Sequence, residues 1–117
     1  MEKYVAIIEA GGANFSSVKN ALDRLNIKYI VTSDPNKIAN SYKVILPGVG
    51  NAKYSMQCIK DLKLYDVIKS LKQPTLGICL GMQLLCRSSE EGNIECLNII
   101  PLDVCLLKDI KIIPEMG

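Results

Sequence analysis

The sequence predicts an α/β fold of three layers, in which helices cover both faces of a mainly parallel sheet. Short apolar runs rich in valine and isoleucine alternate along the chain with segments whose apolar residues recur at helical spacing. This alternation is typical of strands connected through helices, which makes neighbouring strands parallel. The chain has 117 residues, of which 49% are hydrophobic and 22% charged, so one modest domain with an apolar core is expected.

The first half of the chain supplies three of the expected strands. They are the runs at residues 4–8, 27–32 and 42–46, which are apolar and rich in β-branched residues. Between the first two, apolar residues at helical spacing from Phe15 to Leu25 predict a helix, with Asn14 or Ser16 as its N-cap. Pro35 suits the first turn of a short helix before the third strand.

The second half continues this pattern up to residue 85 and then changes. We expect amphipathic helices at 52–59 and 64–71, a strand at 74–78 and a helix at 80–85. The polar segment 86–93 predicts a solvated loop, although Glu90 and Glu91 also offer carboxylates for acid–base chemistry. Three short strands are then expected, at 97–100, 104–107 and 110–113.

The segment around Cys79 carries the most chemical information. Its glycines, Gly77 and Gly81, lie two residues to either side of the cysteine, at the junction of the expected strand and helix. A nucleophile on such a tight turn is held in a strained backbone conformation, and side chains at the two glycines would crowd the turn. The N–H groups of the following helix favour a thiolate, and the N–H of Leu80 is a natural donor to an oxyanion. The alternative is that Cys79 is a small core hydrophobe.

A second glycine loop, at residues 47–52, follows the third expected strand. Gly48 and Gly50 allow its backbone N–H groups to turn toward a ligand, and a loop without a ligand is the alternative. A dinucleotide fingerprint is excluded because Lys53 stands where its third glycine would be. Because the carboxyl ends of parallel strands meet at one edge of a sheet, this loop and the Cys79 turn can face one pocket. A thiolate with two backbone donors is suited to acyl transfer.

The composition excludes several other classes of protein. The net charge is +2, lysines are spread along the chain and aromatic residues are few, so no nucleic-acid interface is expected. No apolar run approaches membrane-spanning length, so no membrane segment is expected. The apolar run at the N-terminus is too short for a signal peptide and ends at Glu9. The five cysteines include no C-x-x-C pair, which favours reduced thiols in the cytoplasm. Histidine is absent from the sequence, which removes most kinds of zinc site. We expect no metal site, and we also expect no cofactor.

The run Gly77-Ile78-Cys79-Leu80-Gly81-Met82-Gln83-Leu84-Leu85 closely resembles the nucleophile segment of class I (triad) glutamine amidotransferases. The resemblance covers nearly the whole chain, and it implies a flavodoxin-like fold that is incomplete at the C-terminus. Residues 1–117 would then be the N-terminal part of a single amidotransferase domain. Within the family the chain is most similar to glutaminase subunits that dock on a (βα)8-barrel synthase (cyclase) in histidine biosynthesis. Such a pair works as a heterodimer.

The resemblance also implies roles for particular residues. Family members hydrolyse glutamine to glutamate and ammonia through a γ-glutamyl thioester, and Cys79 matches their nucleophile. Leu80, Val49 and Gly50 match the residues whose N–H groups stabilise the oxyanion. Gln83 matches a residue that contacts glutamine, and Gly48 is assigned to the same substrate site.

Two departures from the family pattern limit what this chain can do. The family completes its triad with a His-x-Glu motif beyond residue 117, and Glu115 stands where the family usually has histidine. We therefore expect the 117-residue chain to lack the acid–base group of a glutaminase. Two alternatives stay open. The chain is an incomplete glutaminase that only binds a synthase, or it is another flavodoxin-like cysteine protein of the chaperone or peptidase kind, which would need a buried acid beside Cys79.

Overall fold

The four strands of the main sheet are parallel, as the sequence predicts. The computed structural model describes residues 3–11, 15–48, 51–90 and 94–105. Within them the order of the main sheet is β2-β1-β3-β4. The strands are β1 (Val5–Ile8), β2 (Tyr29–Thr32), β3 (Lys43–Leu46) and β4 (Thr75–Gly77). Ala6 pairs with Ile30 on one side and with Val44 on the other, which places β1 inside the sheet.

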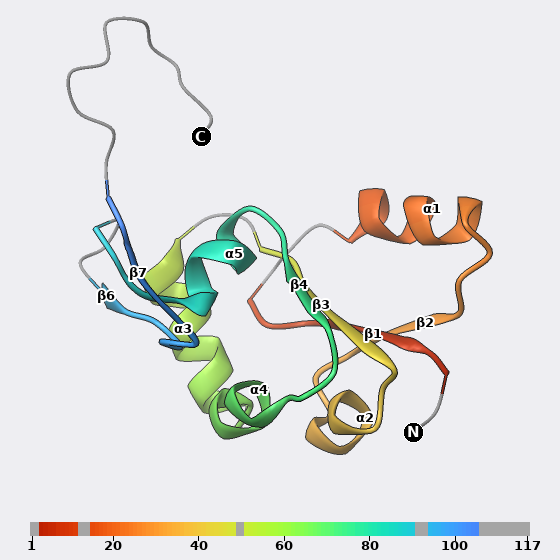
Figure 1. Ribbon diagram of the computed structural model, residues 1–117, viewed down its shortest axis with the longest axis horizontal. Coiled ribbons are helices and arrows are strands. Elements are labelled where there is room, and N and C mark those ends of the chain that lie inside the picture. Colours follow the sequence, from red (N-terminus) through yellow and green to blue (C-terminus); the bar gives the residue numbers. More distant parts are fainter. Residues whose placement is uncertain (1–2, 12–14, 49–50, 91–93, 106–117) are drawn as a thin grey trace, which may run out of the picture.

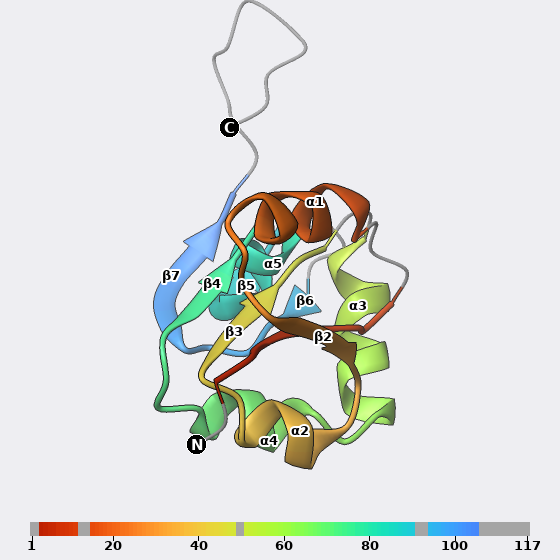
Figure 2. The ribbon, with the colours of Figure 1, turned by 90° about the vertical axis from the view of Figure 1, so that its right-hand side faces the viewer.

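Helices cover both faces of this sheet, so the predicted three layers are confirmed (Figures 1 and 2). Alternate residues of β1 separate the two faces. Val5 and Ile7 pack with Leu22 of α1 (Ser16–Arg24). Tyr4, Ala6 and Ile8 belong to a larger cluster on the opposite face. That cluster includes residues of α2 (Pro35–Ala39), α3 (Ala52–Asp61) and α4 (Tyr65–Ser70).

A helix begins where the sequence predicts it when a side chain caps its first turn. Asp34 caps α2 by accepting a 2.9 Å hydrogen bond from the N–H of Asn36, and Pro35 occupies the first turn as predicted. At α1 the prediction of Ser16 as N-cap is wrong. Ser16 is the first helical residue, and the N-cap position is Phe15, which makes no side-chain cap. The other predicted cap, Asn14, lies outside the described residues.

A second, small sheet follows, and it corrects three predictions. It has the order β6-β5-β7, with strands β5 (Cys86–Ser89), β6 (Ile94–Glu95) and β7 (Ile100–Val104). The segment predicted as a polar loop therefore begins with a strand, which pairs with β6 and β7 and buries Cys86 and Ser89. The strand expected at 97–100 begins only at Ile100, since Leu97 is engaged with the preceding helix, and the one expected from residue 104 ends there. The strand expected at 110–113 lies outside the described residues.

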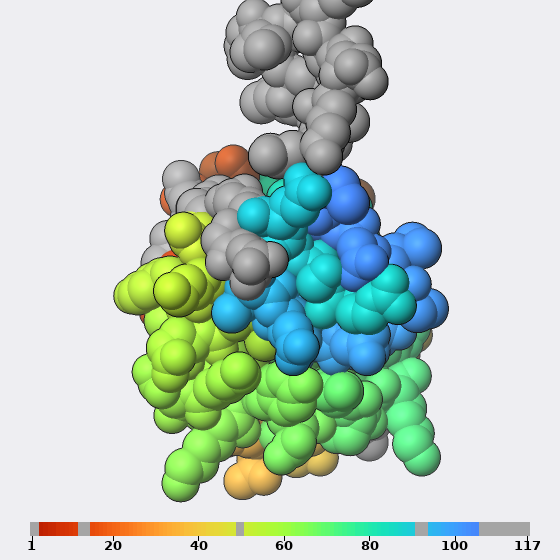
Figure 3. All heavy atoms as spheres, turned by 90° about the vertical axis from the view of Figure 1, so that its left-hand side faces the viewer, coloured from red at the N-terminus to blue at the C-terminus, as the bar shows by residue number. Residues whose placement is uncertain are grey.

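The small sheet lies beside α3 and α4 on one face of the molecule (Figure 3). Cys96 and Leu97, in the connection between β6 and β7, join the same buried cluster as Met56 and Leu64. The small sheet is therefore attached to the main core through a few apolar side chains.

Candidate active site

Cys79 lies on a sharp turn between β4 and the helix α5 (Leu80–Leu85). Its backbone angles are φ 54° and ψ −117°, a conformation that residues with a side chain rarely adopt. Such strain costs about 1–3 kcal/mol and persists only where the surrounding structure enforces it. The thiol is exposed at the tip of this turn. The structure thus has the predicted order of strand, turn and helix.

Close packing explains the two glycines that flank Cys79. A Cβ atom at Gly77 would lie 2.8 Å from the backbone nitrogen of Met82, which is closer than real Cβ contacts. A Cβ atom at Gly81 would overlap the carbonyl oxygen of Leu46 at the end of β3. The predicted crowding is confirmed, and Gly81 lets α5 approach the backbone of the sheet directly.

The glycine loop after β3 meets the Cys79 turn at the carboxyl edge of the main sheet. The N–H of Leu80 donates a 3.3 Å hydrogen bond to the carbonyl of Gly48. A Cβ atom at Gly48 would lie 3.1 Å from the backbone nitrogen of Gly81, so the two segments touch. The expectation that these motifs share one edge is confirmed for Gly48 and Leu80. Val49 and Gly50 lie outside the described residues.

Gln83 lies one helical turn after Cys79 and has an unpaired buried atom. Its N–H donates to the carbonyl of Cys79 at 3.3 Å. Its side-chain Oε1 is buried and has no hydrogen-bond partner among the described residues. Buried polar atoms nearly always have a partner, so this oxygen is the best-marked candidate for a ligand contact beside Cys79.

The sequence offers few candidates for an acid–base partner of Cys79. The sequence has no histidine, and of the three glutamates considered, Glu91 and Glu115 lie outside the described residues. Glu90 is exposed, and its N–H bonds to the carbonyl of Val104 in the small sheet. In the described parts of the chain, histidine, cysteine and acidic side chains form no group of three or more that could hold a metal ion. No helix in those parts is both long and apolar enough to span a membrane.

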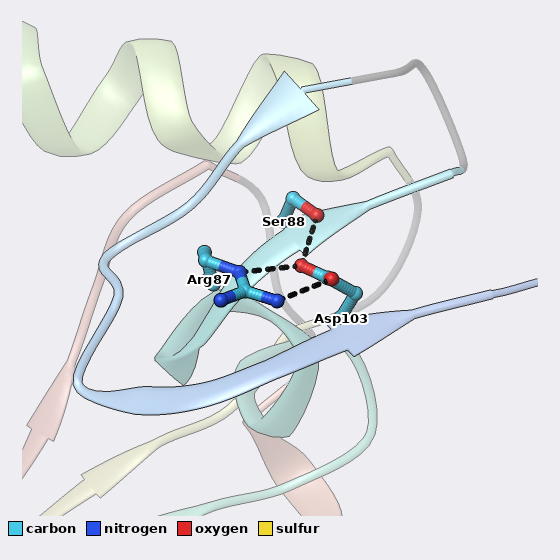
Figure 4. A network of polar contacts seen from close by, with 3 residues as sticks. All are labelled: Arg87, Ser88 and Asp103. Atoms are coloured by element: carbon cyan, nitrogen blue, oxygen red, sulfur yellow. Dashed lines mark hydrogen bonds and ion pairs between the residues drawn. The ribbon is translucent and has the colours of Figure 1, made fainter.

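Sequence reasoning missed a polar network that joins β5 to β7 (Figure 4). Arg87 donates to both carboxylate oxygens of Asp103, at 2.9 Å from Nε and 2.6 Å from Nη2, and Ser88 Oγ donates to Oδ1 at 2.6 Å. The hydrogen bonds from Arg87 and then from Ser88 hold the pKa of Asp103 well below its usual range. Asp103 lies 16 residues after Arg87 and 15 after Ser88, and no local pattern indicates that they meet.

Comparison with known proteins gives the family of this chain. The family Glutamine amidotransferase class-I matches residues 6–112. The chain is 47% identical over 116 residues to the imidazole glycerol phosphate synthase subunit HisH of Bacteroides fragilis, covering 97% of this chain and 59% of the relative. It is 48% identical over 114 residues to the HisH subunit of Pasteurella multocida, covering 97% of this chain and 58% of the relative. The chain thus spans less than two thirds of the length of these relatives.

Solved structures agree with the fold. A crystal structure of a glutamine amidotransferase superposes with a TM-score of 0.74, covering 86% of this chain and 55% of that chain, at 19% sequence identity. This similarity supports the α/β architecture described above, and the sequence matches assign the family. The chain belongs to the class I glutamine amidotransferase family.

Proposed function

We propose that this chain is the nucleophile-bearing, N-terminal part of the glutaminase subunit of an imidazole glycerol phosphate synthase. The observation that carries the proposal is Cys79, exposed on a strained turn with the backbone of Leu80 and Gly48 beside it. Relatives named as that subunit match 97% of the chain at close to half identity. The substrate would be glutamine and the products glutamate and ammonia.

The reaction requires Cys79 to form and lose a covalent bond. Its sulfur attacks the carboxamide carbon of glutamine, the C–N bond breaks as ammonia leaves, and a γ-glutamyl thioester remains. Water then attacks the thioester, releasing glutamate and restoring the thiol. Both steps pass through a tetrahedral oxyanion, which backbone N–H groups stabilise.

Leu80 is one donor in this proposal, and Val49 and Gly50 supply the other. The N–H of Leu80 bonds to the carbonyl of Gly48, so this carbonyl must turn away before an oxyanion can take its place. Gly48 is well suited to such a rotation because it has no side chain. The proposal therefore implies that the loop after β3 changes conformation when glutamine is bound.

Gln83 would help to hold the substrate. Its buried Oε1 can accept a hydrogen bond from an N–H group of glutamine, either the ammonium or the carboxamide. That bond would satisfy an acceptor that has no partner among the described residues. Gly48, at the same edge of the sheet, would form part of the wall of this substrate site.

A complete turnover needs a group that this chain lacks. The amide nitrogen must gain a proton to leave as ammonia and water must be activated, and both require a positioned acid–base residue. Since the 117 residues contain no histidine, we propose that the longer relatives carry this residue in the part that this chain does not span. The ammonia would pass to a (βα)8-barrel synthase (cyclase) subunit in the cytoplasm.

Labelling with a chloroketone analogue of glutamine tests the proposal. We expect covalent modification of Cys79, protection by glutamine but not by asparagine, and no modification of that peptide in Cys79→Ser. Mapping by mass spectrometry separates Cys79 from the other exposed thiol, Cys105. Labelling that glutamine fails to slow would contradict a glutamine site.

The absence of histidine also favours a second function, in which the chain binds a synthase without catalysis. Glutamate release should then stay at background even when the missing part of the domain is supplied as a separate polypeptide. In the proposed function, the two polypeptides together release glutamate and Cys79→Ser abolishes that release.

A further inference from the structure

The C-terminal end of α5, the helix that follows Cys79, is bound by the small sheet. The last carbonyl groups of any helix lack partners within the helix, and α5 obtains them from the connection between β6 and β7. The N–H of Leu97 donates to Leu84 at 2.9 Å, and that of Ile99 to Leu85 at 3.0 Å. The N–H of Asn98 donates to Cys86 at 2.9 Å, directly after the helix.

This connection has one defined shape. Asn98 has φ 54°, a left-handed conformation that asparagine tolerates better than most residues. Leu97 is fully buried in the cluster that also contains Leu80 and Leu84 of α5. The three hydrogen bonds therefore depend on where the ends of the connection are fixed, at β6 and β7.

The fixing of β7 depends on the network around Asp103. The parallel pairing of β5 with β7 is irregular between Cys86 and Ser88, so the regular ladder is interrupted at Arg87. At this interruption Arg87 donates two hydrogen bonds to Asp103, and Ser88 donates a third. Bidentate pairs of this kind are stronger and more directional than single contacts.

We propose that Asp103, acting through Arg87 and Ser88, is a positioning residue for Cys79. The network fixes β7, β7 fixes the connection that binds the end of α5, and α5 holds the strained turn at its beginning. A strained residue keeps its conformation only while its surroundings enforce it. The consequence for catalysis rests on the proposed function, but the coupling to the Cys79 thiol does not.

The reaction rates of the cysteine thiols can measure both ends of this coupling, the turn at Cys79 and the small sheet. Cys79 is already exposed, whereas Cys86 and Cys96, which follow α5 and β6, are buried. Burial, with a smaller effect of Cys86, raises the pKa of the Cys96 thiol and makes it slow to react while the sheet is closed. Iodoacetamide, which needs no glutamine site, gives a rate constant for each thiol by peptide mapping.

In Asp103→Asn we expect iodoacetamide to react with Cys96 on the order of tenfold faster, because the small sheet opens more often. The same variant should react at Cys79 about threefold more slowly, because the strained turn that presents the sulfur to solvent is formed less often. Asp103→Glu should recover most of the Cys79 rate, since it keeps a carboxylate for Arg87. Ser88→Ala, which removes one bond of three, should show a smaller change in the same direction.

Asp61→Asn is the matched control. It also removes an exposed carboxylate that accepts a side-chain hydrogen bond, from Gln57 at 2.8 Å on α3, and it should leave both rates unchanged. A normal Cys79 rate in Asp103→Asn, with Cys96 accelerated, would overturn the proposal and make the network local to the small sheet. Failure of glutamine to protect Cys79 in the chloroketone experiment would contradict the proposed function alone.

Discussion

The main sheet and the small sheet are stabilised by different kinds of contact. In the main sheet, β1 is covered on both faces, and Ala6 and Ile7 are fully buried. In the small sheet, Pro101, Leu102 and Asp103 of β7 are all exposed, and Leu102 retains 63% of its accessible surface. The first sheet therefore depends on apolar packing, and the second on strand pairing and the polar network at Asp103.

This difference assigns different tasks to the two sheets. The main sheet brings the ends of β3 and β4 together, which places Gly48 beside Leu80. The small sheet contributes no atom to that edge among the described contacts, but it binds the opposite end of α5. A support packed through buried apolar side chains thus lies on one side of Cys79, and one with an exposed outer strand lies on the other.

The largest expected effect comes from a side chain added where α5 touches the main sheet. Gly81→Ala places a Cβ atom on the carbonyl of Leu46, so α5 must move or the sheet must distort. We expect a loss of about 4 kcal/mol or more in the free energy of unfolding. Urea denaturation followed by circular dichroism measures it. Gly48→Ala, whose nearest contacts would be 3.1 Å, should cost much less, and equal losses would show that Gly81 is not specially constrained.

A cavity in the main core should cost more than the same truncation near the small sheet. Ile7→Ala removes a fully buried side chain and should destabilise the chain by about 3 kcal/mol. Ile99→Ala is the matched substitution at a residue that is 43% exposed, and it should change stability by less than about 0.5 kcal/mol. Similar losses in the two variants would contradict the division between the sheets.

The smallest expected effect is a pH dependence confined to the small sheet. Because the pKa of Asp103 is lowered in the folded chain, its contribution is complete above the ordinary carboxyl pKa of about 3.9 and is lost as the pH falls below it. Amide protection in β7, measured by hydrogen exchange and corrected for intrinsic rates, should therefore decrease on acidification before protection in β1 does. Asp103→Asn should show low protection of β7 at both pH values. A wild-type β7 that keeps its protection in acid would exclude this role.

Local sequence patterns predicted most of the main sheet and the turn at Cys79. Strands such as β1 are uniformly apolar because both faces are covered, and Asp34 and Pro35 mark the start of α2 within two residues. Gly77 and Gly81 could be identified because tight packing around a nucleophile turn demands them. The neighbouring positions of Gly48 and Leu80 followed from the parallel order of the strands.

The small sheet was harder to predict because its signals are not local. Ser89 is polar yet only 2% exposed, so polarity suggested a loop where a strand exists. Leu97 is apolar and buried, but its N–H serves the end of α5 instead of a strand. The pairing of Arg87 with Asp103 depends on a strand register that composition does not reveal. At the site, the hydrogen bond from Leu80 to Gly48 depends on the orientation of a single loop peptide, which residue types do not specify.

Leu85 is the last residue of α5 and Cys86 is the first of β5. Chain length between Cys79 and Ser89 is consequently fixed by geometry. One inserted residue would turn the helix by about 100° relative to the strand, or reverse the faces of the strand. Either Leu84 or Cys86 would then leave the core, so random insertion libraries should recover no folded variants with added residues in this stretch. For protein engineers, this is a segment whose length cannot be changed, and within it Gly81 cannot be exchanged either.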